Sequence, residues 1–190
     1  AVDGKLCATF ELQDLPKEHA AESIKLLKEY GLRVVMLTGD HAASAFRVAA
    51  EVGIEEIHAH VTAEEKAAFI GQANDEGHIV VMAGDGVNDL LALARADIGI
   101  AMGSGSDIAI EVSDIVLLND SLTSLTEAYA ISRRTYGLIK QNLGISLVYN
   151  AITIPLAMMG YIIPLIAAIS MSFSSLLVVG NSMRSRWMYK

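Results

Sequence analysis

The sequence predicts an α/β fold in which a parallel sheet is covered by helices on both faces and is followed by a two-helix transmembrane hairpin. Short apolar strands alternate with amphipathic helical segments up to residue 118, a pattern typical of parallel sheets. Residues 141–183 contain no charged side chain. One bilayer crossing needs about 20 apolar residues, so this stretch predicts two spans.

Composition narrows the class of protein. The chain has 190 residues, of which 53% are hydrophobic, and this apolar content excludes a disordered protein. The single cysteine, Cys7, excludes a disulfide scaffold and a metal site made of cysteines alone. A net charge of −8 argues against nucleic acid as a partner. All 22 acidic side chains lie between Asp3 and Glu127, so an acidic domain precedes a membrane-like tail.

The elements of the acidic domain are expected in a regular alternation. Strands are predicted over 6–12, 33–37, 56–61, 78–83, 97–101 and 114–118. Helices are predicted over 17–30, 42–52, 63–73, 88–94 and 106–112. Thr62 and Glu65 have capping-box spacing at the start of the third helix. Parallel sheets bind ligands at the carboxyl ends of their strands, where two polar motifs occur.

Thr38-Gly39-Asp40 directly follows an apolar strand. A hydroxyl and a backbone amide beside a glycine suit a phosphate oxygen, but the same residue types also form ordinary turns. Lys66 lies near the start of the helix predicted over 63–73, where it could neutralise a phosphoryl oxygen. The alternative for Lys66 is a solvated surface lysine beside Glu64 and Glu65.

Gly84-Asp85-Gly86-Val87-Asn88-Asp89 follows another apolar strand. Asp85 would lie at the strand tip, and Asp89 would lie on the first turn of the following helix. Mg²⁺ takes one or two carboxylates together with phosphate and water oxygens. A tight turn with an Asx cap would not require six specified residues, so the motif predicts a magnesium site at Asp85 and Asp89.

Together these motifs resemble those of the haloacid-dehalogenase-like phosphotransferases. The stretches 38–40, 84–89 and 97–114 are similar to the phosphorylation domain of P-type ATPases, and the resemblance covers essentially the whole chain. It implies a partial Rossmann-like sheet and an Mg²⁺- and ATP-dependent enzyme. It also implies a metal-binding role for Asp85 and Asp89 and catalytic roles for five residues: Thr38, Gly39, Asp40, Lys66 and Asn88.

The sequence departs from this family in one decisive feature. The family's phosphorylated Asp lies in an Asp-Lys-Thr-Gly-Thr motif, and this sequence has none. The family places that motif upstream, together with the nucleotide-binding insert, the actuator motif and further membrane helices. We therefore expect this chain to be the C-terminal part of a pump, to lack the adenine site and to be inactive alone. A smaller departure is the stretch 62–66, in which relatives commonly carry a proline before the lysine and this sequence carries none, which weakens the assignment of Lys66.

The domain boundaries follow from charge and hydropathy. Residues 1–125 are predicted to be the C-terminal part of a phosphorylation domain, 126–142 a stalk helix, 143–163 and 164–184 transmembrane helices, and 185–190 a cytoplasmic tail. A hairpin places the basic residues before 141 and after 183 on one side, which the positive-inside rule makes cytoplasmic. Residues 1–140 and the C-terminus are therefore expected in the cytoplasm of a bacterium, with the hairpin in its inner membrane.

Polar side chains inside the predicted spans are candidates for a transported-metal site, because such groups are costly in a bilayer. They are Tyr149 and Asn150 in the first span and Met171, Ser174 and Ser175 in the second. A thioether suits Cu(I), although methionine also fills gaps in cores and serine often packs between membrane helices.

The combination of these residues resembles the last two helices of copper-transporting P-type ATPases, as does the stretch 181–184. Zinc-type relatives carry an Asp in the equivalent helix, whereas no acidic residue follows Glu127. The amino-acid sequence around Pro155 and at 174–181 is similar to that of the bacterial copper ATPases that serve cytochrome oxidase assembly. The implied partners are the lipid bilayer, Cu(I), a copper chaperone and the missing N-terminal part of the same pump.

Other residues and other functions are weighed beside this interpretation. His58 and His60 alternate along a short strand and would form only an incomplete metal site, and 103–105 is either a phosphate cradle or a turn. A membrane-anchored phosphatase of the same superfamily is the alternative function, but Asp14 lacks the nucleophile motif. A non-catalytic membrane regulator is a third hypothesis, against which the presence of Asp85 and Asp89 counts.

Overall fold

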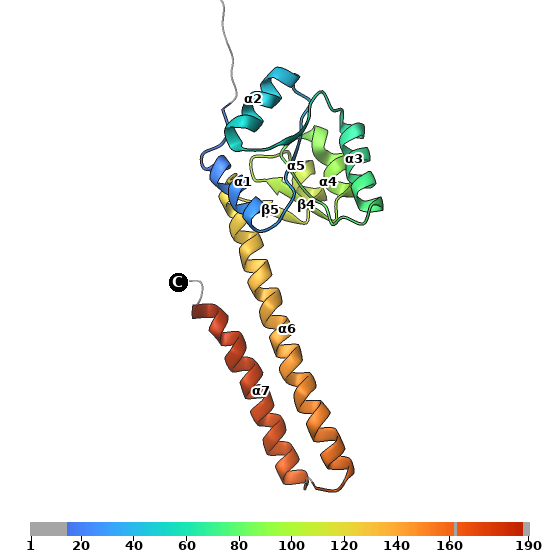
Figure 1. The fold of residues 1–190 in the computed structure, drawn as a ribbon, viewed down its shortest axis with the longest axis vertical. Helices are drawn as coiled ribbons and strands as arrows, with labels where there is room; N and C mark the ends of the chain where they lie inside the picture. Colours follow the sequence, from blue (N-terminus) through green and yellow to red (C-terminus); the bar gives the residue numbers. More distant parts are fainter. Residues whose placement is uncertain (1–14, 162, 188–190) are drawn as a thin grey trace, which may run out of the picture. The chain divides into compact units, whose positions relative to one another are not determined.

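The computed structural model describes residues 15–161 and 163–187 (Figure 1). The chain divides into two compact units, Ala1–Thr126 and Glu127–Lys190. The strand predicted over 6–12, which contains Cys7, lies outside the described residues.

The first unit alternates helices and strands as predicted. Its elements are α1 (Ala20–Glu29), β1 (Val35–Leu37), α2 (Ala42–Val52), β2 (Glu56–His58), α3 (Ala63–Asp75), β3 (Val81–Gly84), the 3₁₀ turn η1 (Val87–Asp89), α4 (Leu90–Arg95), β4 (Ile98–Met102), α5 (Asp107–Val112) and β5 (Ile115–Leu117). Their ends differ from the predicted ones by a few residues, the part of an element that hydropathy patterns define least well.

The strands pair in parallel, as predicted, but form two sheets within the described residues. One sheet has the order β1-β2, and the other has the order β3-β4-β5. Strand β3 is an edge strand, and Val81 on it is 49% exposed. Strand β1 is therefore not hydrogen bonded to β3 among the described residues, and β3 presents an exposed apolar edge.

Two apolar clusters form the core of the first unit. Ala20, Ile24, Leu27 and Val52 bury the facing sides of α1 and α2. The second cluster consists of Ile100, Met102 and Leu117 on β4 and β5. Leu125 packs against both clusters, so the residues that follow β5 help to join the two halves of the unit.

Local polar contacts explain where the helices begin. The Glu65 backbone N–H donates to Thr62 Oγ1 at 3.3 Å, and the Thr62 backbone N–H donates to Glu65 Oε2 at 2.8 Å. This reciprocal pair is the capping box that the spacing predicts. At the start of α5, Ser106 Oγ accepts from the Ala109 amide at 3.2 Å.

Helices α6 (Leu122–Met158) and α7 (Pro164–Trp187) follow, and most of their length forms the second unit. Polar side chains connect them. Asn142 Nδ2 donates to Ser182 Oγ at 2.8 Å, and Asn181 Nδ2 donates to Asn142 Oδ1 at 2.8 Å. The Tyr149 hydroxyl lies 2.9 Å from Ser170 Oγ. Residue 142 pairs with 181 and 182, whereas residue 149, further along α6, pairs with residue 170, earlier in α7, so the two helices are antiparallel.

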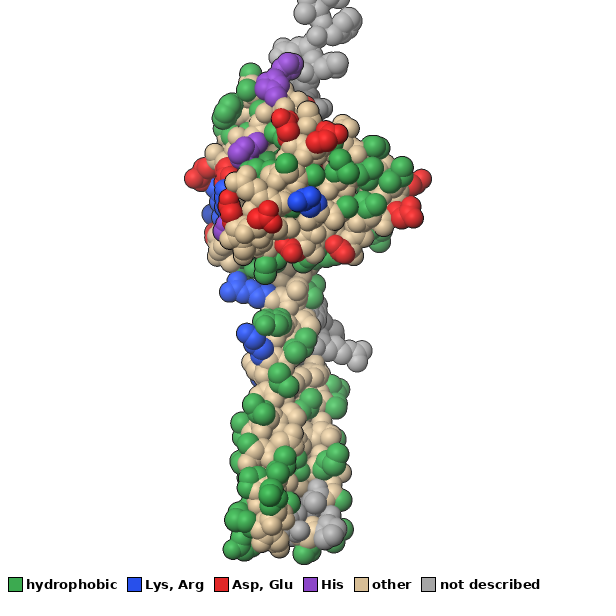
Figure 2. Space-filling model, turned by 90° about the vertical axis from the view of Figure 1, so that its right-hand side faces the viewer, with side chains coloured by type: hydrophobic (Ala, Val, Ile, Leu, Met, Phe, Trp, Pro, Cys, Tyr) green, Lys and Arg blue, Asp and Glu red, His purple; other side chains and the backbone are tan. Residues whose placement is uncertain are grey.

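Among the described residues, no helix combines the length and the apolar character that a bilayer crossing requires. The predicted transmembrane hairpin over 143–163 and 164–184 is therefore not supported by the structure. The prediction relied on the absence of charged side chains, but a side chain without charge can still be polar and therefore costly in a bilayer. Uncharged polar residues are frequent in both helices, including Asn142 and Asn150 in α6 and four serines over 170–175 in α7. Figure 2 shows hydrophobic side chains along this helical part and acidic side chains on the α/β unit.

Candidate functional site

The loop after β1 holds the Thr38 hydroxyl in a defined hydrogen bond. Thr38 Oγ1 accepts from the Asp40 backbone N–H at 3.1 Å. The Thr38 amide donates to the His58 carbonyl at 3.0 Å, and the Thr38 carbonyl accepts from the Val61 amide at 3.0 Å. A hydroxyl that accepts in this way keeps its own proton for another acceptor. Thr38 is half-buried, whereas Gly39 and Asp40 are exposed.

The structure brings Lys66 and Asp89 together. Lys66 Nζ donates to Asp89 Oδ1 at 2.8 Å, and the two residues are only 8% and 9% exposed. The alternative interpretation of Lys66 as a solvated surface lysine is therefore wrong. A buried ion pair contributes to a site only when its charges are matched and hydrogen bonded, as these are.

Gly84 allows the Asp89 side chain to lie over the end of β3. A Cβ added at Gly84 would lie 2.7 Å from Asp89 Cβ and 2.8 Å from its Oδ2. The Asp89 amide also donates to the Gly86 carbonyl at 3.1 Å, which closes the 3₁₀ turn. Gly84 therefore has a steric purpose, which is to let the Asp89 carboxylate lie against the strand end.

Asp85 and Asn88 are exposed on the same turn. Asp85 and Asp89 offer the hard oxygen donors that Mg²⁺ prefers. No group of three or more His, Cys, Asp or Glu side chains able to hold a metal occurs in the described part of the chain. A site with two carboxylates fits Mg²⁺ in particular, because this ion retains water and phosphate oxygens. The proximity of Thr38 to this turn stays a prediction.

The loop at 103–105 is a turn rather than a phosphate cradle. Gly103 and Gly105 donate their amides to the Leu117 and Met102 carbonyls, both at 2.8 Å. The Ser104 amide donates to Asp120 Oδ1 at 2.7 Å. Hydrogen bonding to the side chain and then the backbone of Ser104 lowers the pKa of the Asp120 carboxyl below its usual value. All three amides therefore have partners within the fold, and none points to a bound anion.

His58 and His60, considered as a possible metal site, contact different partners. His58 Nε2 lies 3.5 Å from Glu56 Oε1, and its ring packs against Phe69 with 4.7 Å between centroids. The His60 ring lies edge-on to His41 with 5.0 Å between centroids. Their alternation along the strand therefore does not produce a shared metal site.

The residues predicted for the transported metal are only partly brought together. Tyr149 is half-buried and contacts Ser170 on α7, and Ser174 is half-buried. Asn150, Met171 and Ser175 are exposed, with Met171 at 68%. Ser170, Gln141 and Asn142 were not predicted as site residues, and Asn181 and Ser182 were noted only as part of the stretch 181–184. Their signal was present, because these polar residues stand at matched distances on either side of the turn between the helices.

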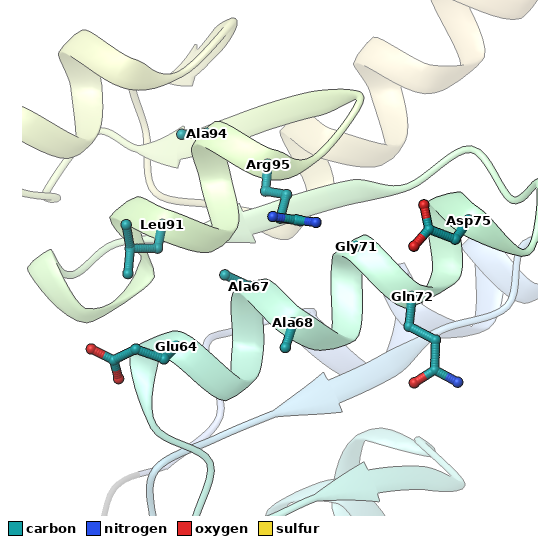
Figure 3. A pocket seen from close by; sticks show the side chains of 9 residues that line it. All are labelled: Glu64, Ala67, Ala68, Gly71, Gln72, Asp75, Leu91, Ala94 and Arg95. Carbon is teal, nitrogen blue, oxygen red and sulfur yellow. The ribbon is translucent and has the colours of Figure 1, made fainter.

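A shallow hollow of about 750 Å³ lies between α3 and α4 (Figure 3). Small residues of α3, including Ala67 and Gly71, form one side, and Arg95 of α4 extends over Gly71. None of the predicted catalytic residues lines this hollow. The candidate site is therefore the end of β3 and the adjoining turns, not the hollow between α3 and α4.

Comparison with protein families agrees with this geometry. Residues 1–97 match a family model described as haloacid dehalogenase-like hydrolase, and residues 68–128 match a second model with the same description. The chain belongs to the haloacid dehalogenase-like hydrolase family.

The relatives of this hydrolase-family chain are P-type ATPases, which are ATP-driven translocases. It is 44% identical over 97% of its length to a probable copper-exporting P-type ATPase V of Mycobacterium tuberculosis, of which it covers 24%. It is 44% identical, again over 97% of its length, to a copper-exporting P-type ATPase of Bacillus subtilis, of which it covers 23%. The predicted resemblance to this group is confirmed, and the chain spans about a quarter of the length of these relatives.

Solved structures give the same result. A zinc-transporting PIB-type ATPase in its E2.Pi state aligns with a TM-score of 0.85 and 34% identity, covering 91% of this chain and 28% of that chain. A catalytic domain of a CPx-ATPase aligns with a TM-score of 0.59 and 34% identity, covering 63% of this chain and 47% of that one. The α/β unit is thus a haloacid-dehalogenase-like fold.

Proposed function

We propose that this chain is part of an ATP-driven Cu(I) pump and supplies the magnesium- and phosphate-stabilising half of its phosphorylation site. The observation that carries the proposal is the buried Lys66–Asp89 ion pair at the carboxyl end of β3. Similarity to copper-exporting P-type ATPases over 97% of the chain favours a pump over a phosphatase of the same superfamily.

Each residue of the site has a chemical role in this proposal. The phosphorylated Asp would come from the part of the pump that precedes this chain. Lys66 has three N–H donors, of which one is given to Asp89, so the others can donate to a phosphoryl oxygen. The Thr38 hydroxyl would donate to a second oxygen, and Gly39, Asp40 and Asn88 would shape the loops around it.

Asp85 and Asp89 would hold Mg²⁺. The metal, when bound, neutralises charge on the phosphoryl group. Asp89 can serve both neighbours because its Oδ1 accepts from Lys66 while a carboxylate offers a second oxygen. ATP would bind mainly to the nucleotide-binding insert elsewhere in the pump.

We further propose that α6 and α7 belong to the transport region of the assembled pump in a bacterial inner membrane, where their side chains would contact the pump's other helices. Residues 1–140 and the C-terminus would lie on the cytoplasmic side of the pump. Tyr149, Asn150, Met171, Ser174 and Ser175 would contact the transported ion. No acidic residue follows Glu127, and a thioether beside an amide suits Cu(I) better than Zn²⁺. A copper chaperone is a proposed partner.

The catalytic part of the proposal is tested by Asp85→Asn in the complete pump. Phosphorylation of the pump by inorganic phosphate with Mg²⁺ should fall by about 10²-fold or more, because the metal contributes several kcal/mol of charge stabilisation. Asp75→Asn is the matched control, since Asp75 is an exposed carboxylate on α3. Equal phosphorylation of the Asp85→Asn pump and the natural pump would contradict the assignment.

A further inference from the structure

The loop that carries Thr38 is attached to the loop that follows β2. The His60 amide donates to the Asp40 carbonyl at 3.1 Å, and the Val61 amide donates to the Thr38 carbonyl at 3.0 Å. A third link is made by a side chain, because the Ala42 backbone N–H donates to His60 Nε2 at 3.3 Å. The two loops are therefore joined at three successive points.

The third link caps helix α2. The first amides of a helix have no partner within the helix, and His41, the N-cap residue of α2, makes no side-chain capping bond. Ala42 is the first residue of α2, so His60 supplies from another loop the acceptor that the N-cap residue does not. The edge-on contact with the His41 ring at 5.0 Å holds the imidazole beside this amide.

We propose that His60 is a positioning residue that holds the Thr38–Asp40 loop in the shape needed to receive a phosphoryl group. The Asp40 amide bonds to the Thr38 hydroxyl, and the Asp40 carbonyl bonds to the His60 amide. The imidazole then fixes the start of α2 two residues later. His60 acts through Thr38, and this inference therefore rests on the proposed phosphate-binding function.

The backbone of His60 argues that its side chain matters. Its φ is +58°, in the left-handed region that disfavours most residues with a side chain. Asparagine tolerates this region better than histidine does, but its side chain is too short to place an acceptor where Nε2 lies. Glutamine reaches that place and offers an oxygen there. His60 therefore meets two requirements at once, because histidine is among the residues that tolerate a positive φ and its Nε2 accepts from the Ala42 amide.

The first experiment measures the bond itself, in the complete 190-residue chain in detergent. In His60→Asn, hydrogen exchange of the Ala42 amide should accelerate by about three- to ten-fold, the effect of losing one hydrogen bond. In His60→Gln, exchange should stay within about two-fold of the natural chain, because the acceptor is restored. His58→Asn is the control, since His58 contacts Phe69 and Glu56 instead of α2.

The second experiment measures the consequence, in the complete pump. The apparent affinity for inorganic phosphate in phosphoenzyme formation should fall by about three- to ten-fold in His60→Asn and be rescued in His60→Gln. Both variants should be fully folded at the temperature of the assay, as an unfolding curve of each shows, which separates positioning from loss of the fold. Natural affinity in His60→Asn, or unchanged Ala42 exchange, would overturn the inference. If the natural pump itself forms no phosphoenzyme, the proposed function fails instead.

Discussion

At the scale of single residues, the buried Lys66–Asp89 pair is held by two opposing effects. Removing both charges from water is costly, and their attraction at 2.8 Å offsets that cost. Each charge is therefore tolerated only because the other is present.

This balance predicts the effect of deleting one partner. Lys66→Met should destabilise the α/β unit by about 3–5 kcal/mol, because Asp89 is left as an unpaired buried charge. Adding Asp89→Asn should recover part of that loss. Urea unfolding of the two variants measures both effects. A loss in Lys66→Met below about 0.5 kcal/mol, the range of surface substitutions, would show that the pair is not buried in solution.

Asp120 provides a prediction about pH. Its hydrogen bonds with Ser104 lower its pKa below the ordinary value of 3.8. A lowered folded-state pKa contributes stability above the unfolded-state pKa, and this contribution is lost as the pH falls through the folded-state value. Asp120→Asn should therefore be less stable than the natural chain at pH 6, and the difference should shrink as the pH falls below 3.8, the ordinary value of this pKa.

The Asp120→Asn comparison is well matched, because the φ of residue 120 is +51° and asparagine accepts this conformation. Denaturant unfolding of both chains across this pH range is the measurement. A constant difference between the two chains at every pH would contradict the role of the charge.

At the scale of elements, the start of α3 determines where Lys66 lies. The capping box at Thr62 and Glu65 ends immediately before Lys66 in the sequence. Ile70, one turn further along α3, is 1% exposed. The cap and the buried face together direct the lysine toward Asp89.

Removing the cap should weaken this element. Thr62→Ala should cost about 1 kcal/mol of unfolding free energy, the usual cost of losing an N-cap hydroxyl. Thr62→Ser keeps an oxygen that can accept from the Glu65 amide, so it should retain most of that energy. Thermal unfolding of the two variants checks the prediction, and equal losses in both would rule out the cap as the cause.

At the scale of the whole molecule, the catalytic and transport parts of the proposal can be tested separately. In the complete pump, Met171→Leu should reduce Cu(I) binding and Cu(I)-stimulated ATP hydrolysis by about ten-fold, since leucine keeps the volume and removes the soft sulfur ligand. Phosphorylation by inorganic phosphate should survive, because Met171 lies in the second unit.

Met158→Leu is the control for this measurement, because Met158 ends α6 and is 84% exposed. Unchanged copper binding in Met171→Leu together with strong stimulation by Zn²⁺ would overturn the copper assignment. A metal-transporting pump of undefined specificity would remain.

Several features of the molecule are determined by the sequence alone, because they depend on neighbouring residues. Apolar strands followed by Thr38-Gly39-Asp40 and by the Gly84–Asp89 motif predict polar groups at the ends of parallel strands. The capping box joins Thr62 to Glu65, which is only three positions further along the chain, so it can be predicted from the sequence. The order of helices and strands in the first unit follows from such local patterns, and these are visible without a structure.

Only the tertiary structure decides features whose partners are distant in the sequence. Lys66 is buried because Asp89, 23 residues away, meets it, although neighbouring glutamates predict a solvated lysine. The turn at 103–105 is not a phosphate cradle, because the Gly103 amide donates to the Leu117 carbonyl and the Ser104 amide donates to Asp120 Oδ1. His60 caps a helix that begins 18 residues earlier. Charge and hydropathy are properties of one residue at a time, whereas burial and hydrogen bonding belong to pairs that only folding brings together.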